Sequence, residues 1–305
     1  MTVSRPTPPR ADQIKAVLWA LAAVCSFAAM AVAGREAGRS LDTFEIMTYR
    51  SIIGIVLVCG VITLRRRWGD IRRDRLGLHG ARNLCHFAGQ NLWLYALTVI
   101  PLAQVAVLEF SYPIWVALAA PFLLGERMTL QRAVAVALGF AGILLVVRPG
   151  LMPVNAGTLA ALGAAFCFAG VALATRKLTA DQTTLCIMFW LTAMQLVMGL
   201  VMALHDGAMA LPDARALPFV IVVGLAGLLA HVFLTTALSL APATLVMPVE
   251  FLRLPITATL GAVLYLEGLD PFVLLGSAVI LGGNLVNLWP RRAPHVAGTS
   301  RRKLP

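Results

Sequence analysis

Ten apolar stretches, each close to the length that crosses a bilayer as a helix, follow one another along this chain. Hydrophobic residues make up 59% of the sequence and charged residues 13%, about half the charged share of a soluble domain. Because the stretches are apolar on every helix face, they predict an all-α polytopic membrane protein rather than a soluble bundle. The ten transmembrane helices are expected at 16–34, 44–64, 78–97, 104–124, 130–148, 156–175, 183–204, 217–238, 244–264 and 272–289.

The second half of the sequence repeats the first at a constant offset of 141 residues. The offset places Glu109 on Glu250 and Arg35 on Arg176. One offset without a gap indicates an internal duplication, so each repeat is expected to contain five spans. The predicted divisions are a disordered N-terminal segment at 1–15, a first repeat at 16–149, a second repeat at 150–290 and a basic tail at 291–305.

Positive charges are distributed unevenly over the connections between the spans. With the N-terminus in the cytoplasm, 19 of the 25 Lys and Arg residues fall on the cytoplasmic side, Arg82 among them, and four fall on the outer side. This bias predicts a multi-pass protein of a bacterial-type inner membrane with both termini inside. Since each repeat has an odd number of spans, the second repeat must enter from the opposite side, which gives two inverted five-helix repeats.

The net charge of +11 follows from this topological bias, so no nucleic-acid partner is predicted. The arginines at 65–75 are expected to contact anionic lipid headgroups at the cytoplasmic face. The five cysteines lie in or beside apolar spans without a C-x-x-C pair, so neither a metal site nor a cofactor is predicted. The sequence contains no H-E-x-x-H, G-x-S-x-G or G-x-x-x-x-G-K-[ST] motif, and no enzyme activity is predicted.

Ionisable residues inside the spans are the first candidates for a binding site, because a charge in lipid is costly. Glu250 and Arg253 lie on one face of the ninth span and can pair with each other, which leaves a scaffold role open beside a substrate contact. Glu109, in the fourth span, needs a partner from another helix, a proton or a substrate. Arg50 either lines a cavity or extends to the outer surface.

Polar side chains recur at helical spacing on the third and eighth spans. Lipid offers no hydrogen-bond partners, so these stripes face either a wet cavity or other helices. Aromatic residues are expected to supply cavity walls, whereas Trp93 fits an interfacial belt equally well. The predicted substrate-binding residues are Arg50, His86, Gln90, Asn91, Tyr95, Glu109, Tyr112, Trp190, His231, Thr235, Glu250 and Arg253.

A series of short motifs recurs in the two halves. The first copy is Tyr95-Ala96-Leu97, Pro101-Leu102-Ala103, Pro113-Ile114 and Gly125-Glu126, and the weaker second copy is Ala237-Leu238, Pro242, Pro255-Ile256 and Glu267. With the ten spans, this pattern resembles the EamA branch of the drug/metabolite transporter superfamily over about residues 15–290. Pro255 departs from the pattern by one position. The resemblance implies a secondary carrier for small metabolites with a central cavity, and the span-end Glu126 and Glu267 are expected to serve structure.

The sequence therefore predicts a secondary active transporter that moves a small polar or amphipathic metabolite by alternating access. Glu109 and Glu250 would carry substrate contacts or a coupled proton. The alternative is a membrane scaffold or lipid-handling protein without an aqueous substrate, whose polar stripes pair off inside the bundle. A membrane enzyme would need His86 and Glu109 side by side.

Overall fold

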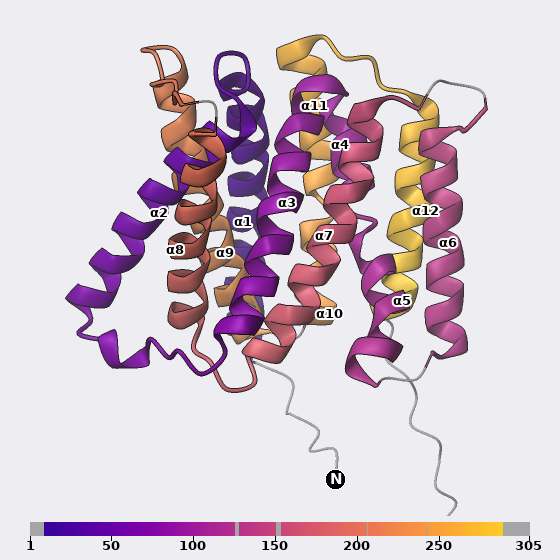
Figure 1. The fold of residues 1–305 in the computed structure, drawn as a ribbon. Helices are drawn as coiled ribbons and strands as arrows, with labels where there is room; N and C mark the ends of the chain where they lie inside the picture. Colours follow the sequence, from indigo (N-terminus) through magenta and orange to yellow (C-terminus); the bar gives the residue numbers. More distant parts are fainter. Residues whose placement is uncertain (1–8, 126–127, 151–153, 206, 242, 289–305) are drawn as a thin grey trace, which may run out of the picture.

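The computed structural model describes residues 9–125, 128–150, 154–205, 207–241 and 243–288, and the elements assigned there are helices (Figure 1). The first repeat contains α1 (Arg10–Ala37), α2 (Thr43–Leu64), the short 3₁₀ helix η1 (Trp68–Asp70), α3 (Leu76–Val99), α4 (Leu102–Glu109), α5 (Tyr112–Leu124) and α6 (Leu130–Val147). The second contains α7 (Ala156–Leu178), α8 (Thr184–Ala203), α9 (Ala216–Leu240), α10 (Ala243–Glu250), α11 (Arg253–Tyr265) and α12 (Pro271–Leu288).

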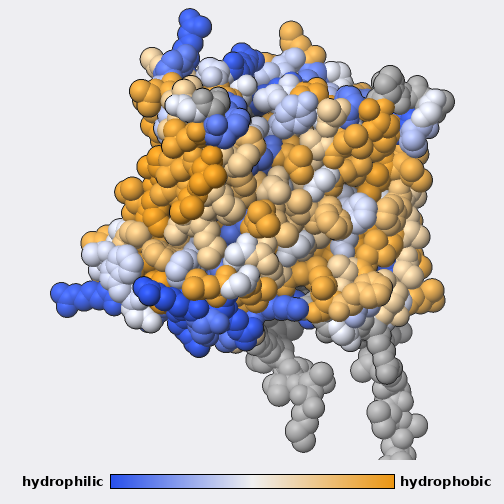
Figure 2. All heavy atoms as spheres, viewed as in Figure 1, coloured by the Kyte–Doolittle hydropathy of each residue, from blue (hydrophilic) through white to orange (hydrophobic). Residues whose placement is uncertain are grey.

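The described helices form ten membrane-spanning units. Nine are long and apolar enough to cross a bilayer by composition, with α4 and α5 counting as one span and α10 and α11 as another. The tenth is α3, which has 24 residues but carries a row of buried polar side chains. Figure 2 shows a broad hydrophobic band around the visible face of the bundle, with hydrophilic residues gathered at its two ends. The predicted all-α polytopic fold is confirmed.

The two repeats fold into the same helices at the offset seen in the sequence. Helices α10, α11 and α12 begin and end 141 residues after α4, α5 and α6, and α8 and α9 begin within one residue of the positions that the offset gives. Figure 1 shows α1 beginning at the lower end of the bundle and α7 at the upper end. The repeats are therefore inverted, as an odd number of spans requires.

The repeats interlock instead of forming separate lobes. Helix α1 packs against α9 and α3 packs against α7, and each of these pairs becomes the other when the repeats are exchanged. Helices α2 and α6 pack against α8 and α12, their own repeat equivalents. Each half of the protein thus completes the other half's helix packing, and the interior is shared.

The fourth and ninth spans, predicted as continuous helices, are each interrupted at their centre. Helix α4 ends at Glu109 and α10 ends at Glu250, and two residues separate each from the helix that follows. The carbonyl groups of a final helical turn need outside partners. Phe110 O accepts a hydrogen bond of 3.2 Å from Asn284 Nδ2, and Leu108 O accepts one of 2.6 Å from Ser111 Oγ. The first break therefore brings a satisfied helix end into the interior, and the two breaks place Glu109 and Glu250 at equivalent positions there.

Helices α6 and α12 approach each other through glycines. A Cβ atom on Gly276 would lie 2.7 Å from the carbonyl oxygen of Gly142, and one on Gly142 would lie 2.8 Å from the oxygen of Gly276. Small residues allow membrane helices to pack backbone against backbone. This pair of helices forms a tight buttress at one side of the bundle (Figure 1).

Candidate functional site

An ion pair joins the two repeats where the fourth and ninth spans break. Arg253 Nη2 donates a hydrogen bond of 2.7 Å to Glu109 Oε1, and Trp93 Nε1 donates one of 2.9 Å to Glu109 Oε2. The side chains of Arg253 and Glu109 are only 9% and 14% exposed. Both oxygens of Glu109 are engaged, so the partner that the sequence required for this residue comes from another helix.

Aromatic rings enclose the guanidinium group of Arg253. Its Cζ lies 4.6 Å from the ring centre of Phe110 and 5.0 Å from that of Phe27. Rings at this distance stabilise a cation through their quadrupole. Arg253 Nε is buried and has no hydrogen-bond partner among the described residues. The cation is thus held in a largely dry environment with one donor still available.

Glu250 lies beside this pair without joining it. The residue is 5% exposed, and its Oε1 has no hydrogen-bond partner in the described part of the chain. The Glu250–Arg253 pair that the helical spacing left open is not formed there, because Arg253 binds Glu109. Tyr112 lies close enough to interact with the charges of Arg253, Glu109 and Glu250. A buried carboxylate with a vacant oxygen can accept a proton or bind a cationic group.

A second polar group fixes α3 against α8 and α7. Gln195 Nε2 donates hydrogen bonds to His86 Nδ1 at 2.9 Å and to Asn83 O at 3.3 Å. Arg82, which the charge count placed on the cytoplasmic side, is 3% exposed and donates to Thr175 Oγ1 at 2.7 Å. Part of the polar stripe on α3 therefore does pair with neighbouring helices, as the scaffold alternative expects.

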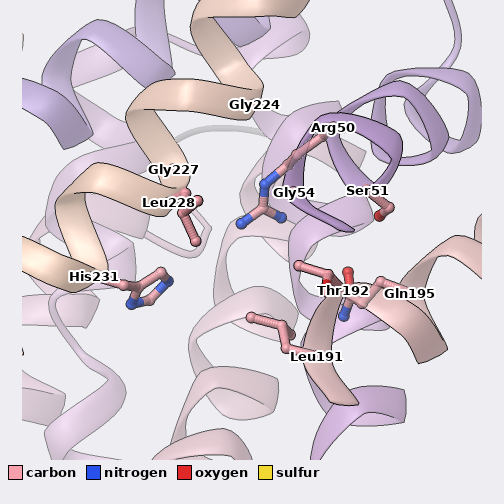
Figure 3. A pocket seen from close by; sticks show the side chains of 10 residues that line it. All are labelled: Arg50, Ser51, Gly54, Leu191, Thr192, Gln195, Gly224, Gly227, Leu228 and His231. Atoms are coloured by element: carbon pink, nitrogen blue, oxygen red, sulfur yellow. The ribbon is translucent and has the colours of Figure 1, made fainter. Parts of the chain in front are cut away.

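A cavity of about 30 Å³ lies next to this network, between α2, α8 and α9 (Figure 3). Figure 3 shows the guanidinium group of Arg50 pointing into the space between these helices, with His231 and Gln195 on its other sides. The imidazole of His231 lies 6.5 Å from that of His86 and 5.8 Å edge-on from Phe27. A second cavity of about 10 Å³ borders Glu109 and Arg253, and Phe27 also lines it. Phe27 thus stands between the two sites.

The remaining predicted residues are divided between the interior and the periphery. Gln90 and Asn91 are buried on α3, and Asn91 Nδ2 donates to Phe87 O at 2.8 Å. Tyr95 and Thr235 are exposed and lie outside both cavities. Trp190 Nε1 donates to Arg72 O at 2.8 Å and so holds the loop that precedes α3.

Sequence reasoning missed several residues of these sites. Gln195 was the clearest available signal, since it is a lone amide within an apolar span. For Trp93 the sequence left an interfacial belt and a site equally open, and the structure buries it against Glu109. No cluster of His, Cys, Asp or Glu suited to a metal ion occurs among the described residues. His86 and Glu109, the pair that an enzyme would need, have different partners.

Inverted repeats that share broken helices, buried charges and small central cavities define a class of protein, the multi-pass membrane transporters. The sequence profile of the EamA-like transporter family matches this chain twice, at residues 14–148 and 155–289. The two matched segments begin and end 141 residues apart, which is the offset of the repeats. The chain belongs to the EamA-like transporter family, and the resemblance stated from the sequence is confirmed.

Similar proteins of this class have been named for different solutes. A riboflavin transporter of Brucella anthropi is 30% identical over 87% of this chain and 95% of its own length. An S-adenosylmethionine uptake transporter of Rickettsia felis is 26% identical over 90% and 92%. A pseudopaline exporter of Pseudomonas aeruginosa is 26% identical over 87% and 93%. A chain of known crystal structure shares the fold with a TM-score of 0.62, at 20% identity over 89% of this chain and 96% of that chain.

Proposed function

We propose that this protein is a secondary active transporter that carries a small polar or amphipathic metabolite across the inner membrane by alternating access. The Glu109–Arg253 ion pair is the observation that carries the proposal. It is buried, it joins the two inverted repeats, and it lies where both contributing spans are broken. A charged group inside a membrane protein lowers its stability, so its presence there favours a role in binding the substrate or coupling an ion.

The size of the cavities supports the conformational part of the proposal. Volumes of about 30 Å³ and 10 Å³ hold only a few water molecules, far less than a metabolite. A substrate can therefore occupy these two cavities beside the buried charges only after helices of the two repeats move apart. Loading and release are then separate conformations, as alternating access requires.

An ion pair at the upper end of the bundle is suited to act as a gate. Arg35 of α1 pairs with Glu267, which follows α11 and also accepts a hydrogen bond of 2.9 Å from the backbone N–H of Leu102. The guanidinium group of Arg35 lies 4.3 Å above the ring of Tyr265. These contacts tie the first repeat to the second, and opening the upper end would break them.

The repeat offset assigns Arg176 and Glu126 to the positions equivalent to Arg35 and Glu267. Glu126 lies outside the described residues, so no contact is assigned to it. In an inverted duplication the equivalent pair belongs to the opposite face. The proposed cycle breaks Arg35–Glu267 in the upward-open conformation.

Exposed arginines support the proposed orientation. Figure 2 shows a hydrophilic patch at the lower end of the bundle, where α2 ends and α3 begins. The connection between these helices carries exposed arginines at 65–67, 72, 73 and 75. Arginines of short loops favour the cytoplasmic side and bind anionic headgroups there. We place the lower end in the cytoplasm, in contact with anionic lipids.

The test is flux through the purified protein in liposomes. Riboflavin, S-adenosylmethionine and pseudopaline, for which the relatives are named, form the first panel together with a metabolite extract of the host cell. Saturable counterflow of at least one solute is expected from the unmodified protein. Glu109→Gln should abolish it, while Asp12→Asn at the exposed start of α1 should not. Full flux from a protein that carries both Glu109→Gln and Glu250→Gln would remove these carboxylates from the mechanism.

A further inference from the structure

The cavity beside Arg50 is built from positions that the duplication relates to one another. The offset of 141 residues places Arg50 on Leu191, Ser51 on Thr192 and Gly54 on Gln195, and all six line the cavity. Each pair joins a residue of α2 to the equivalent residue of α8, so the cavity lies between two helices that the duplication relates to each other. It therefore lies on the axis that relates the two repeats, at the interface between repeats where inverted-repeat transporters bind their solutes.

The chemistry at these positions is not symmetric. The first repeat supplies a cation at Arg50 where the second has the apolar Leu191, and the second supplies an amide at Gln195 where the first has Gly54. An unmodified duplication would give two identical half-sites. This divergence instead gives one cavity with a cationic wall on α2 and a polar wall on α8 (Figure 3).

Helix α9 provides the space that the Arg50 side chain occupies. Gly227 is the repeat equivalent of His86, so α9 lacks a side chain where α3 has an imidazole. A Cβ atom on Gly227 would lie 3.1 Å from Nε of Arg50 and 3.3 Å from its Nη2. The guanidinium group thus rests directly against the backbone of α9, and its position depends on this glycine.

None of the described residues that line the cavity is acidic. The hydrogen bond assigned to the Arg50 side chain in the described structure is a long one of 3.6 Å from Nη1 to the sulfur of Met47. Glu109 is engaged by Arg253 and Trp93. A guanidinium group removed from bulk water without an anionic partner is costly, so a ligand is the expected source of the missing charge.

We propose that this cavity is an anion subsite that receives a carboxylate group of the transported solute. The planar fork of an arginine matches a carboxylate, to which it can donate two parallel hydrogen bonds. A volume of about 30 Å³ suits such a small group, with the rest of the solute occupying space that opens between the repeats. The inference rests on the proposed transport function and narrows its substrates to solutes that carry a carboxylate.

The test uses small carboxylates and their uncharged amide twins as probes. The full-length protein in detergent is heated with sodium nicotinate or nicotinamide, benzoate or benzamide, and acetate or acetamide, at matched ionic strength. A ligand that binds the folded state raises the unfolding temperature. We expect at least one carboxylate to raise the Tm by about 2 °C or more over its amide twin. Arg50→Gln should remove this difference, and Arg73→Gln in the exposed loop should retain it.

A second variant separates the geometry of the subsite from its charge. Gly227→Ala keeps Arg50 but displaces its guanidinium group. The difference in Tm between a carboxylate and its amide twin, here called the carboxylate effect, should therefore fall several-fold. Gly60 has open space around it, so Gly60→Ala should leave this difference unchanged. An equal carboxylate effect in the unmodified protein and in Arg50→Gln overturns the subsite, and so does the lack of a carboxylate–amide difference in all three pairs. Liposome flux is measured separately. Transport of neutral solutes alone would contradict the proposed subsite and leave the proposed transport function intact.

Discussion

Arg253, the first residue of α11, donates a hydrogen bond of 2.7 Å to Glu109, the last residue of α4. The two residues belong to different repeats, and each lies beside the break in its own span. A contact of this kind depends on the relative position of the two halves as well as on the fold of either half. It therefore couples the packing of the repeats to the state of the charges between them.

Arg253→Met should destabilise the protein by about 3–5 kcal/mol, because it leaves the carboxylate of Glu109 buried without its cation. Adding Glu109→Gln to this variant should restore part of the loss, since the remaining amide carries no charge. Chemical denaturation in detergent, followed by tryptophan fluorescence, measures both effects. A double variant less stable than Arg253→Met alone would contradict this account of the pair.

Gln195→Leu should cost about 1–3 kcal/mol, because it removes the donor for two buried acceptors, His86 Nδ1 and the carbonyl oxygen of Asn83. Thr236→Val is the matched control, since the Thr236 hydroxyl donates only to Val232 O within its own helix in the described structure. Thermal unfolding of the two variants should differ clearly. Equal unfolding temperatures would mean that the amide of Gln195 does not hold α8 against α3.

Gly276→Ala should destabilise the contact between α6 and α12, because the added Cβ would lie 2.7 Å from the carbonyl oxygen of Gly142 and the backbones must separate. Overpacking of this kind costs about 1–3 kcal/mol. Gly282→Ala on the same helix has open space around it and should be neutral or slightly stabilising. The comparison is made by thermal unfolding, and a neutral Gly276→Ala would exclude a close approach of the two backbones.

Glu267→Gln should favour the upward-open conformation, because it removes the charge that pairs with Arg35 across the repeats. The readout is the labelling rate of a cysteine placed at Gln195 by a water-soluble maleimide applied from the upper side, in a protein without its native cysteines. Labelling should be several-fold faster than in the same cysteine reporter protein that retains Glu267. The reciprocal exchange, Arg35→Glu with Glu267→Arg, should bring the rate back toward that of the unmodified pair.

An unchanged labelling rate in Glu267→Gln would show that the ion pair is not a gate. Asp70→Asn provides the control, because Asp70 pairs with Arg67, three residues earlier in the same repeat. Its labelling rate should match that of the unmodified protein. The comparison isolates the contact between repeats from a general change in surface charge.

The helices and their inverted order could be predicted from the sequence because membrane helices satisfy their backbone groups within each segment. Residues 130–148 were expected to form a helix, and α6 spans Leu130–Val147. The breaks after Glu109 and Glu250 were not predicted, although Pro113 and Pro255 lie a few residues beyond them. Proline disrupts the helical hydrogen bonds that precede it, so both residues were available signals.

Partners within the site could not be predicted, because they depend on helix packing between repeats. Helical spacing suggested Glu250 for Arg253, yet the packing of α4 against α11 brings Glu109 to it instead. Burial of Arg82 and Trp93 depends in the same way on the neighbours of α3. Sequence patterns identify which residues are costly in lipid, and only the packed bundle decides how each is paired.

Helix α3 also constrains how the protein is made. It buries His79, Arg82 and Asn83, and its polar composition sets it apart from the nine apolar spans of the described chain. An arginine costs up to about 3 kcal/mol at the centre of a span on leaving the translocation channel, and less at Arg82, which lies near the start of α3. Its packing partner α7 is synthesised later, so α3 should stay beside the channel until α7 emerges. Helices of the two repeats would then assemble in pairs as the later partner emerges, and the first repeat would not be completed by itself.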